Sequence, residues 1–226
     1  MLPGRRDGVG RLFVKSTPPP PFNSAFMGGI ALSPLGQVQI ATAPANAYDA
    51  VTLNGVAGTG VSTPNSAANS ITGDIDIRVK AAVTDWTPAA ANALVSKRSA
   101  ASGEYFFLID ASGKLDLLWY GTGATLRQCQ STVSPTVADG ATLWVRATRD
   151  VAGLVVTFYT SSDGATWTIL GTPVAFTAFT PATTTVNVSI GVDGDLSSTP
   201  LSGKIYEAEI RNGINGPVAV SFDASN

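Results

Sequence analysis

The fold is decided by one stretch in the middle of the chain, Gly103-Glu-Tyr-Phe-Phe-Leu-Ile-Asp110, followed by Ala111-Ser-Gly113 and Lys114-Leu-Asp-Leu-Leu-Trp-Tyr120. The first segment is apolar on both faces, as expected of a strand in the middle of a sheet. The three residues after it are typical of a turn, and a second apolar run follows. The stretch therefore predicts a β-hairpin buried within a larger sheet.

Strands with alternating polarity are predicted on either side of this hairpin. Leu143, Val145 and Ala147 share one face of a run in which Arg146 and Thr148 point the other way. That period of two is typical of a half-buried antiparallel strand. About a dozen short strands without a helix predict an all-β, two-sheet antiparallel jelly-roll sandwich. The runs are 74–83, 93–97, 104–110, 115–120, 125–132, 142–149, 154–160, 166–170, 184–192, 204–211 and 218–222.

An extended N-terminal arm, residues 1–45, precedes the sandwich at 46–226. Ser16-Thr-Pro-Pro-Pro-Pro-Phe22 predicts a polyproline II spacer, and two apolar runs after it predict a small hairpin. Because a hairpin of this size is marginal alone, we expect the arm to dock on another surface. The expected docking residues are Phe22, Phe26, Met27, Ile30, Leu32, Val38 and Ile40.

Composition excludes several classes of protein. Only 13% of the residues are charged, about half the usual share. The single cysteine cannot form a disulfide within the chain, and there is no histidine. No apolar run is long enough to span a membrane, and the prolines near the N-terminus replace the apolar core of a secretory signal. The few basic residues at the N-terminus are too sparse to predict nucleic-acid binding.

Several segments together resemble the concanavalin A-like, laminin-G-like jelly-roll family. Leu94-Val-Ser-Lys-Arg98 and the central hairpin are similar to the middle hairpins of that family. Asp139 to Asp150 is similar to its strand with Asp-Gly, a tryptophan and Thr-Arg-Asp, and Ser161-Ser-Asp-Gly-Ala-Thr-Trp167 matches a turn common in such sandwiches. The resemblance covers residues 46–226 and implies the same two-sheet fold.

The resemblance leaves function open, because the family includes glycosidases, lectins and structural modules. Its hydrolases carry a Glu-x-Asp-x-x-Glu strand. Here Asp74 with Asp76, and Glu207 with Glu209, each supply only part of that pattern. A glycosidase needs two carboxylates flanking the sugar, and no histidine offers another route to acid–base chemistry. We therefore expect no enzymatic activity, no catalytic residues and no cofactor.

A loop with several oxygen-bearing side chains is the candidate metal site. Asp193-Gly-Asp195 is followed by Ser197 and Ser198, and related sandwiches often hold calcium near such loops. Calcium takes about six to eight oxygen ligands, and this loop offers only a few. An Asx turn is therefore the favoured interpretation, with Asp193 and Asp195 as weak candidate ligands.

Large aromatic side chains are the candidate glycan-facing residues. Trp86, Trp119 and Tyr120 are the first choice, and Trp144 and Trp167 belong to the same group. Aromatic rings can stack on sugars, but in a sandwich they more often pack in the core or at its rim. Packing is therefore the favoured interpretation, with Trp86, Trp119 and Tyr120 as possible glycan-facing residues.

The arm adds a second resemblance, which concerns function. Gly28 to Val38 resembles the Gly-Gly-apolar, turn, Gly-x-Val segments near the start of small phage virion proteins. The resemblance implies a capsid decoration protein, assembled in the bacterial host cytoplasm as a small homo-oligomer, with other capsid or tail subunits as partners. The alternative is a tail-associated adhesin that binds a host glycan, and the third is a glycan hydrolase. Neither a membrane nor nucleic acid is an expected partner.

Overall fold

The computed structural model describes residues 30–32, 38–40, 49–99, 103–122, 125–194 and 198–225. The chain divides into two compact units, Met1–Ala45 and Asn46–Asn226. In the first unit, β1 (Ile30–Leu32) pairs with β2 (Val38–Ile40) in an antiparallel hairpin. These strands contain four of the predicted docking residues, whereas Phe22, Phe26 and Met27 lie outside the described residues. Docking by the arm stays a prediction.

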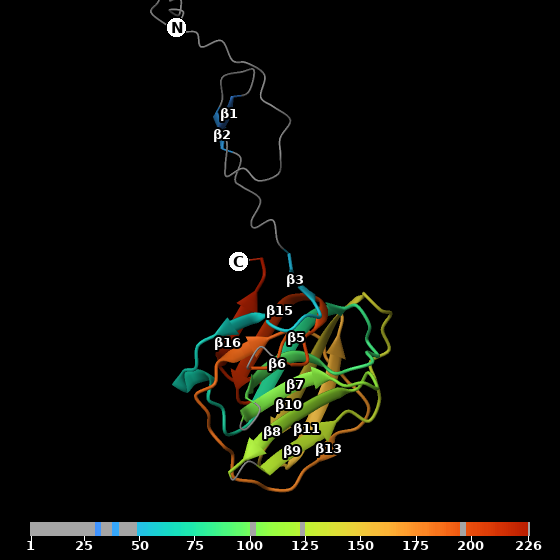
Figure 1. The fold of residues 1–226 in the computed structure, drawn as a ribbon, viewed down its shortest axis with the longest axis vertical. Coiled ribbons are helices and arrows are strands. Elements are labelled where there is room, and N and C mark those ends of the chain that lie inside the picture. The colour runs from blue at the N-terminus through green and yellow to red at the C-terminus, as the bar shows by residue number, and fades with distance from the viewer. Residues whose placement is uncertain are drawn as a thin grey trace, which may run out of the picture. The chain divides into compact units, whose positions relative to one another are not determined.

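Two antiparallel sheets make up the second unit (Figure 1), which confirms the predicted sandwich. The larger sheet has the strand order β12-β11-β10-β5-β15-β16, while β3 pairs with β15 and β13 pairs with β11. Its strands are β3 (Val51–Asn54), β5 (Ile75–Val83), β10 (Thr142–Asp150), β11 (Val155–Ser161), β12 (Thr168–Ile169), β13 (Val174–Ala175), β15 (Ser202–Asn212) and β16 (Val218–Asp223).

The smaller sheet has the order β4-β14-β6-β7-β8-β9 and contains the central hairpin. Its strands are β4 (Val61–Thr63), β6 (Asn92–Arg98), β7 (Gly103–Ile109), β8 (Leu115–Gly121), β9 (Thr125–Gln130) and β14 (Val188–Ile190). Every residue of β7 is buried, as predicted for a central strand. The turn between β7 and β8 needs Gly113, because its φ is +77° and a Cβ there would lie 2.7 Å from the carbonyl oxygen of Trp86.

Each predicted run contains a strand, but three short strands were not predicted. β3, β4 and β13 have two to four residues each, too few to show an alternating pattern. The described residues contain no α-helix; a single 3-10 turn, η1 (Ala67–Asn69), precedes β5. No helix in this part of the chain is long and apolar enough to cross a membrane.

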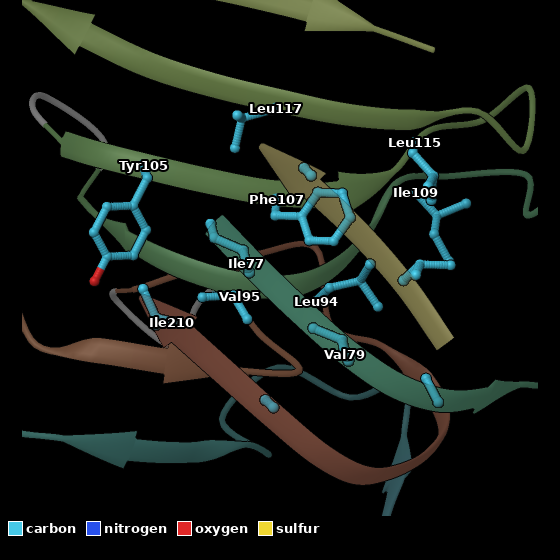
Figure 2. Close-up of a cluster of buried hydrophobic side chains, with 14 of the residues drawn as sticks. Ile77, Val79, Leu94, Val95, Tyr105, Phe107, Ile109, Leu115, Leu117 and Ile210 are labelled. Carbon is cyan, nitrogen blue, oxygen red and sulfur yellow. The ribbon is translucent and has the colours of Figure 1, made fainter. Parts of the chain in front are cut away.

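The hydrophobic core lies between the sheets. Figure 2 shows Ile77 and Val79 of β5 facing Phe107 and Leu117 of the smaller sheet, all of them buried. Burying one such side chain stabilises the fold by roughly 1.5–3 kcal/mol. Because successive residues of a strand point to opposite faces, the neighbours of Ile77 and Val79 lie on the outer face of the larger sheet.

A buried ion pair ties the smaller sheet to two loops. Lys97 Nζ lies 2.6 Å from Glu104 Oε1, and both side chains are fully buried. The ammonium also donates to the carbonyl of Thr184 at 3.0 Å, and the amide of Ile71 donates to Glu104 Oε2 at 3.1 Å. These bonds satisfy both charges, which makes burial of the pair tolerable.

Candidate functional site

The candidate site is the outer face of the larger sheet, where half-buried aromatic rings alternate with charged side chains. Trp144 of β10 lies directly opposite Lys80 of β5, and Lys80 lies opposite Glu207 of β15. The three residues therefore lie side by side on neighbouring strands. Their strand neighbours Val79, Ala81 and Val145 face the core and are fully buried. The core thus holds this face in place from below.

The turn between β11 and β12 places Trp167 beside Trp144. The Asp163 carboxylate accepts hydrogen bonds from the amides of Thr166 at 2.8 Å and Ala165 at 2.9 Å, and these bonds lower its pKa to about 2. Gly164 has a φ of +73°, and a Cβ there would lie 2.7 Å from Cε2 of Trp144. The turn therefore packs against the indole of Trp144 and leads directly into Trp167.

The two indoles form a corner. Their ring centroids are 6.2 Å apart, and the ring planes meet at 80°. In this T-shaped arrangement the edge of one indole points toward the face of the other, which is a common geometry for aromatic pairs.

A third ring follows across the sheet. The Lys80 ammonium lies 5.8 Å from the ring centroid of Trp144 and 5.6 Å from that of Tyr206. It also forms an ion pair with Glu207 at 3.0 Å. We call Trp167, Trp144 and Tyr206, with Lys80 between the last two, the aromatic row.

Two arginines share one carboxylate beside this row. Arg78 and Arg146 donate to Asp76 Oδ2 at 2.8 and 2.7 Å, and both also donate to Asn215 Oδ1. Burial alone would raise the pKa of Asp76, but the hydrogen bonds from Arg78 and Arg146 outweigh it and leave the pKa below its ordinary value. Asp76 is therefore a structural anion that fixes both guanidinium groups.

The guanidinium groups support the aromatic rings. Those of Arg78 and Arg146 lie 5.7 and 5.4 Å from the ring centroid of Trp167, and that of Arg146 lies 4.9 Å from the centroid of Tyr159. Such cation–π contacts contribute about 0.5–2 kcal/mol each. Together with the turn, these contacts fix the position of the Trp167 ring.

Two hollows adjoin Tyr206. One, of about 350 Å³, is lined by Thr52, Ala82, Asp139 and Lys204 among others. The other, of about 370 Å³, is lined by Asp49, Lys80, Glu207 and Asp223 among others. The row therefore ends in a surface that is hollowed on more than one side and rich in hydrogen-bonding groups.

Trp86 and Trp119, the aromatics first chosen as glycan-facing, lie elsewhere, and for them that interpretation is wrong. They are 2% and 1% exposed, because both pack in the core. Trp86 Nε1 donates to the carbonyl of Ala141, while the Trp119 ring packs against Phe176 at 5.1 Å between centroids. Neither ring can reach a ligand at the surface.

Tyr120 is half-buried at the end of β8, in the smaller sheet. Its hydroxyl accepts a hydrogen bond from Arg98 Nη1 at 3.3 Å. Tyr120 is therefore not part of the aromatic row, which belongs to the larger sheet. Its role as a glycan-facing residue stays a prediction.

Asp193, the candidate metal ligand, is engaged in a different role. Its carboxylate accepts from Arg98 Nη2 at 2.5 Å, from Ser96 Oγ at 2.8 Å and from Ser198 Oγ at 3.0 Å. The side chain is 2% exposed, and Asp195 lies outside the described residues. Within the described ranges, no three acidic, cysteine or histidine side chains are grouped as metal ligands. A cation at Asp193 would have to displace these donors.

Glu207 and Glu209 share the outer face, as the alternation of β15 predicts. Each has a basic partner: Glu207 pairs with Lys80, and Glu209 accepts a hydrogen bond from Arg211. Both are half-buried and lie on one strand, two residues apart. That Glu207 and Glu209 perform no catalysis stays a prediction.

One buried acid lies on the other sheet. Asp116 of β8 is 2% exposed, and its Oδ2 accepts a hydrogen bond from Gln128. Its Oδ1 has no hydrogen-bond partner among the described residues. Burial raises the pKa of Asp116 to about 7, and the charge of Asp110 adds to the effect.

Comparisons with known proteins support the fold. No family model matches the sequence, and no curated protein matches it. Among solved structures, the CBM40 of the Ruminococcus gnavus IT-sialidase bound to α2,6-sialyllactose has a TM-score of 0.55 at 14% identity, covering 73% of this chain and 90% of that chain. Domains LG4-5 of the mouse laminin α1 chain have a TM-score of 0.52 at 15% identity, covering 78% and 43%. The leech intramolecular trans-sialidase has a TM-score of 0.55 at 15% identity, covering 77% and 26%.

The sandwich thus has the jelly-roll fold of these domains, which confirms the predicted fold class. Identities this low establish the fold alone, and function has to be argued from the site.

Proposed function

We propose that this chain is a carbohydrate-binding module whose glycan site is the aromatic row. The observation that carries the proposal is the corner formed by Trp144 and Trp167 on the outer face, with centroids 6.2 Å apart. Binding sites combine aromatic surface with a few placed polar groups. Here Lys80 and Glu207 supply such groups next to the rings.

A purely structural role explains these indoles less well. The core is complete beneath them, since Val79, Ala81 and Val145 are fully buried between the sheets. Trp144 and Trp167 instead stay half-buried on the outer face, where an aromatic ring exposes apolar surface to water. An anchor for a ligand accounts for this exposure. The fold is compatible, because a solved domain with this fold is bound to sialyllactose.

The proposal favours the adhesin over the capsid decoration protein. A tail-associated adhesin would attach to the particle through the arm and present the aromatic row to a glycan of the host envelope. Placement on a phage virion rests on the resemblance of the arm, and it remains a prediction.

A glycan array tests the proposal. The full chain is compared with Trp144→Ala and Trp167→Ala, and Leu126→Ala is the control, because Leu126 is a 46% exposed side chain on the smaller sheet. We expect saturable binding that either tryptophan change weakens by about tenfold or more, since an anchor side chain contributes about 1.4 kcal/mol or more. Circular dichroism confirms folding of each variant. Absence of binding to any glycan, or equal binding by all variants, would refute the proposal.

A further inference from the structure

The length of the aromatic row bears on which part of a glycan it binds; this inference rests on the proposed function. Trp144 lies on β10 and Tyr206 on β15, with β5 between them in the sheet. Neighbouring strands are about 4.8 Å apart, so the two strands are about 10 Å apart. One sugar ring cannot stack on both side chains. The row therefore offers two subsites, the Trp144–Trp167 corner and the Tyr206 ring.

The surface continues past the second subsite. The two hollows beside Tyr206 have volumes of about 350 and 370 Å³, one toward Thr52 and Lys204 and the other toward Asp49 and Asp223. A site for the end of a glycan would close around the terminal sugar. This one instead leaves room for a chain that extends beyond the ring.

The charges along the row are balanced. Lys80 pairs with Glu207 at 3.0 Å, and Arg211 donates to Glu209. Arg78 and Arg146 share Asp76, and Asp223 lines the same hollow as Lys80, so four carboxylates lie among these four cations. A polyanionic glycan would meet these carboxylates as well as the cations, so it gains little from this face. An uncharged glycan can hydrogen-bond to both partners of each pair.

We infer that the aromatic row binds an internal stretch of a linear, uncharged glycan, with one part on the Trp144–Trp167 corner and another on Tyr206. The chain crosses the strands of the larger sheet and passes over Lys80 between the two subsites. Hydrogen bonds to Lys80 and Glu207 fix its orientation.

Isothermal titration calorimetry with oligosaccharides of increasing length tests this inference. The probes are β-glucan and chitin oligomers from the monosaccharide to the hexasaccharide, and polysialic acid is the polyanion. For the uncharged probe that binds, we expect affinity to rise by about tenfold or more with length, then level off once both subsites are filled. Affinity should change little with salt. Equal affinity for monosaccharide and hexasaccharide, or tighter, salt-sensitive binding of polysialic acid, overturns the inference but leaves the proposed function intact.

Variants assign the two subsites. Tyr206→Ala should reduce the affinity for the hexasaccharide to that for the short probes and leave the short probes unaffected, while Tyr206→Phe keeps the ring and the affinity. Trp167→Ala should weaken binding of the short probes and of the hexasaccharide. If Tyr206→Ala leaves hexasaccharide affinity unchanged, the second subsite does not exist. If no carbohydrate binds the parent chain, the proposed function fails with it.

A matched pair of glycine changes tests the corner without removing a ring. Gly164→Ala places a methyl group 2.7 Å from the Trp144 indole, whereas Gly58→Ala has the same kind of positive φ, +85°, and no atom within 4 Å. Both changes strain the backbone, but only the first displaces the indole. We expect Gly164→Ala alone to weaken binding of short and long probes. Equal affinity of the two variants would contradict the assignment of the corner.

Discussion

Replacing Asp116 by asparagine should make the stability of the sandwich less dependent on pH. The carboxyl group is 2% exposed, has one oxygen without a partner among the described residues, and has a pKa raised from 3.8 to about 7 by burial. Because this pKa is higher in the folded than in the unfolded chain, the folded state binds the proton more tightly. The stabilisation is fully present below the unfolded pKa and is lost as pH rises through about 7.

The magnitude follows from the part of this window that is tested. Between about pH 5 and the pKa of about 7, the pH rises by about two units while Asp116 stays protonated only in the folded chain. The parent protein should therefore lose about 3 kcal/mol of unfolding free energy between about pH 5 and pH 8. Asparagine keeps the shape and cannot ionise, so Asp116→Asn should not lose it. Asp76 does not obscure the comparison, because its pKa is lowered and its contribution is lost only as pH falls into the acid range.

Urea unfolding at several pH values measures the difference. The free energy of unfolding of Asp116→Asn, measured relative to the parent, should rise by about 3 kcal/mol between about pH 5 and pH 8. Asp163→Asn is the control, because that carboxylate has its pKa lowered to about 2 and stays ionised throughout this range. Parallel pH profiles for the parent and Asp116→Asn would refute the assignment of a raised pKa to Asp116.

Three further predictions concern other parts of the chain. Lys97→Met should lower the free energy of unfolding, measured by urea denaturation, by about 3–5 kcal/mol, because it leaves Glu104 as a buried, unpaired charge. Adding Glu104→Gln to this variant should recover part of the loss. Chelator should not change the melting temperature, because Asp193 is bound by Arg98. A cation present at 100 times its dissociation constant would contribute about 2.7 kcal/mol, so a clear drop would show that one is bound. Deleting residues 1–45 should leave the melting temperature of the sandwich unchanged, since the core clusters of the described residues lie entirely within 46–226; a cooperative loss of structure would contradict this.

Much of the sandwich could be predicted because its strands carry their own pattern. The alternation of Leu143, Val145 and Ala147 correctly indicates the core face of β10, and it equally places Trp144 on the opposite face with Arg146. The same reasoning places Trp119 with Leu115 and Leu117 inside the core. For Trp119 and Trp144, alternation was therefore a better guide than residue type to which face of the sheet the ring lies on.

Other parts of the site depend on contacts that no local pattern contains. Asp76 and Arg146 are separated by 70 positions in the chain, and they meet only because β5 and β10 pair in one register. Tyr206 reaches the outer face at a bulge in β15, between Ile205 and Glu207. A bulge changes the side to which residues point, and nothing in the surrounding sequence indicates where it falls.

The shared register of core and site limits how this surface can evolve. Trp144, Lys80 and Glu207 stand opposite one another on the strands that also carry Val145, Val79 and Ala208 into the interior. Inserting one residue in β5 would exchange its two faces and destroy ligand recognition and folding together. Point substitutions of half-buried outer-face residues such as Trp144 and Tyr206 leave the two faces of each strand in place. Diversification of ligand preference should therefore proceed by replacement within the strands, while changes in length are confined to turns such as the one before Trp167.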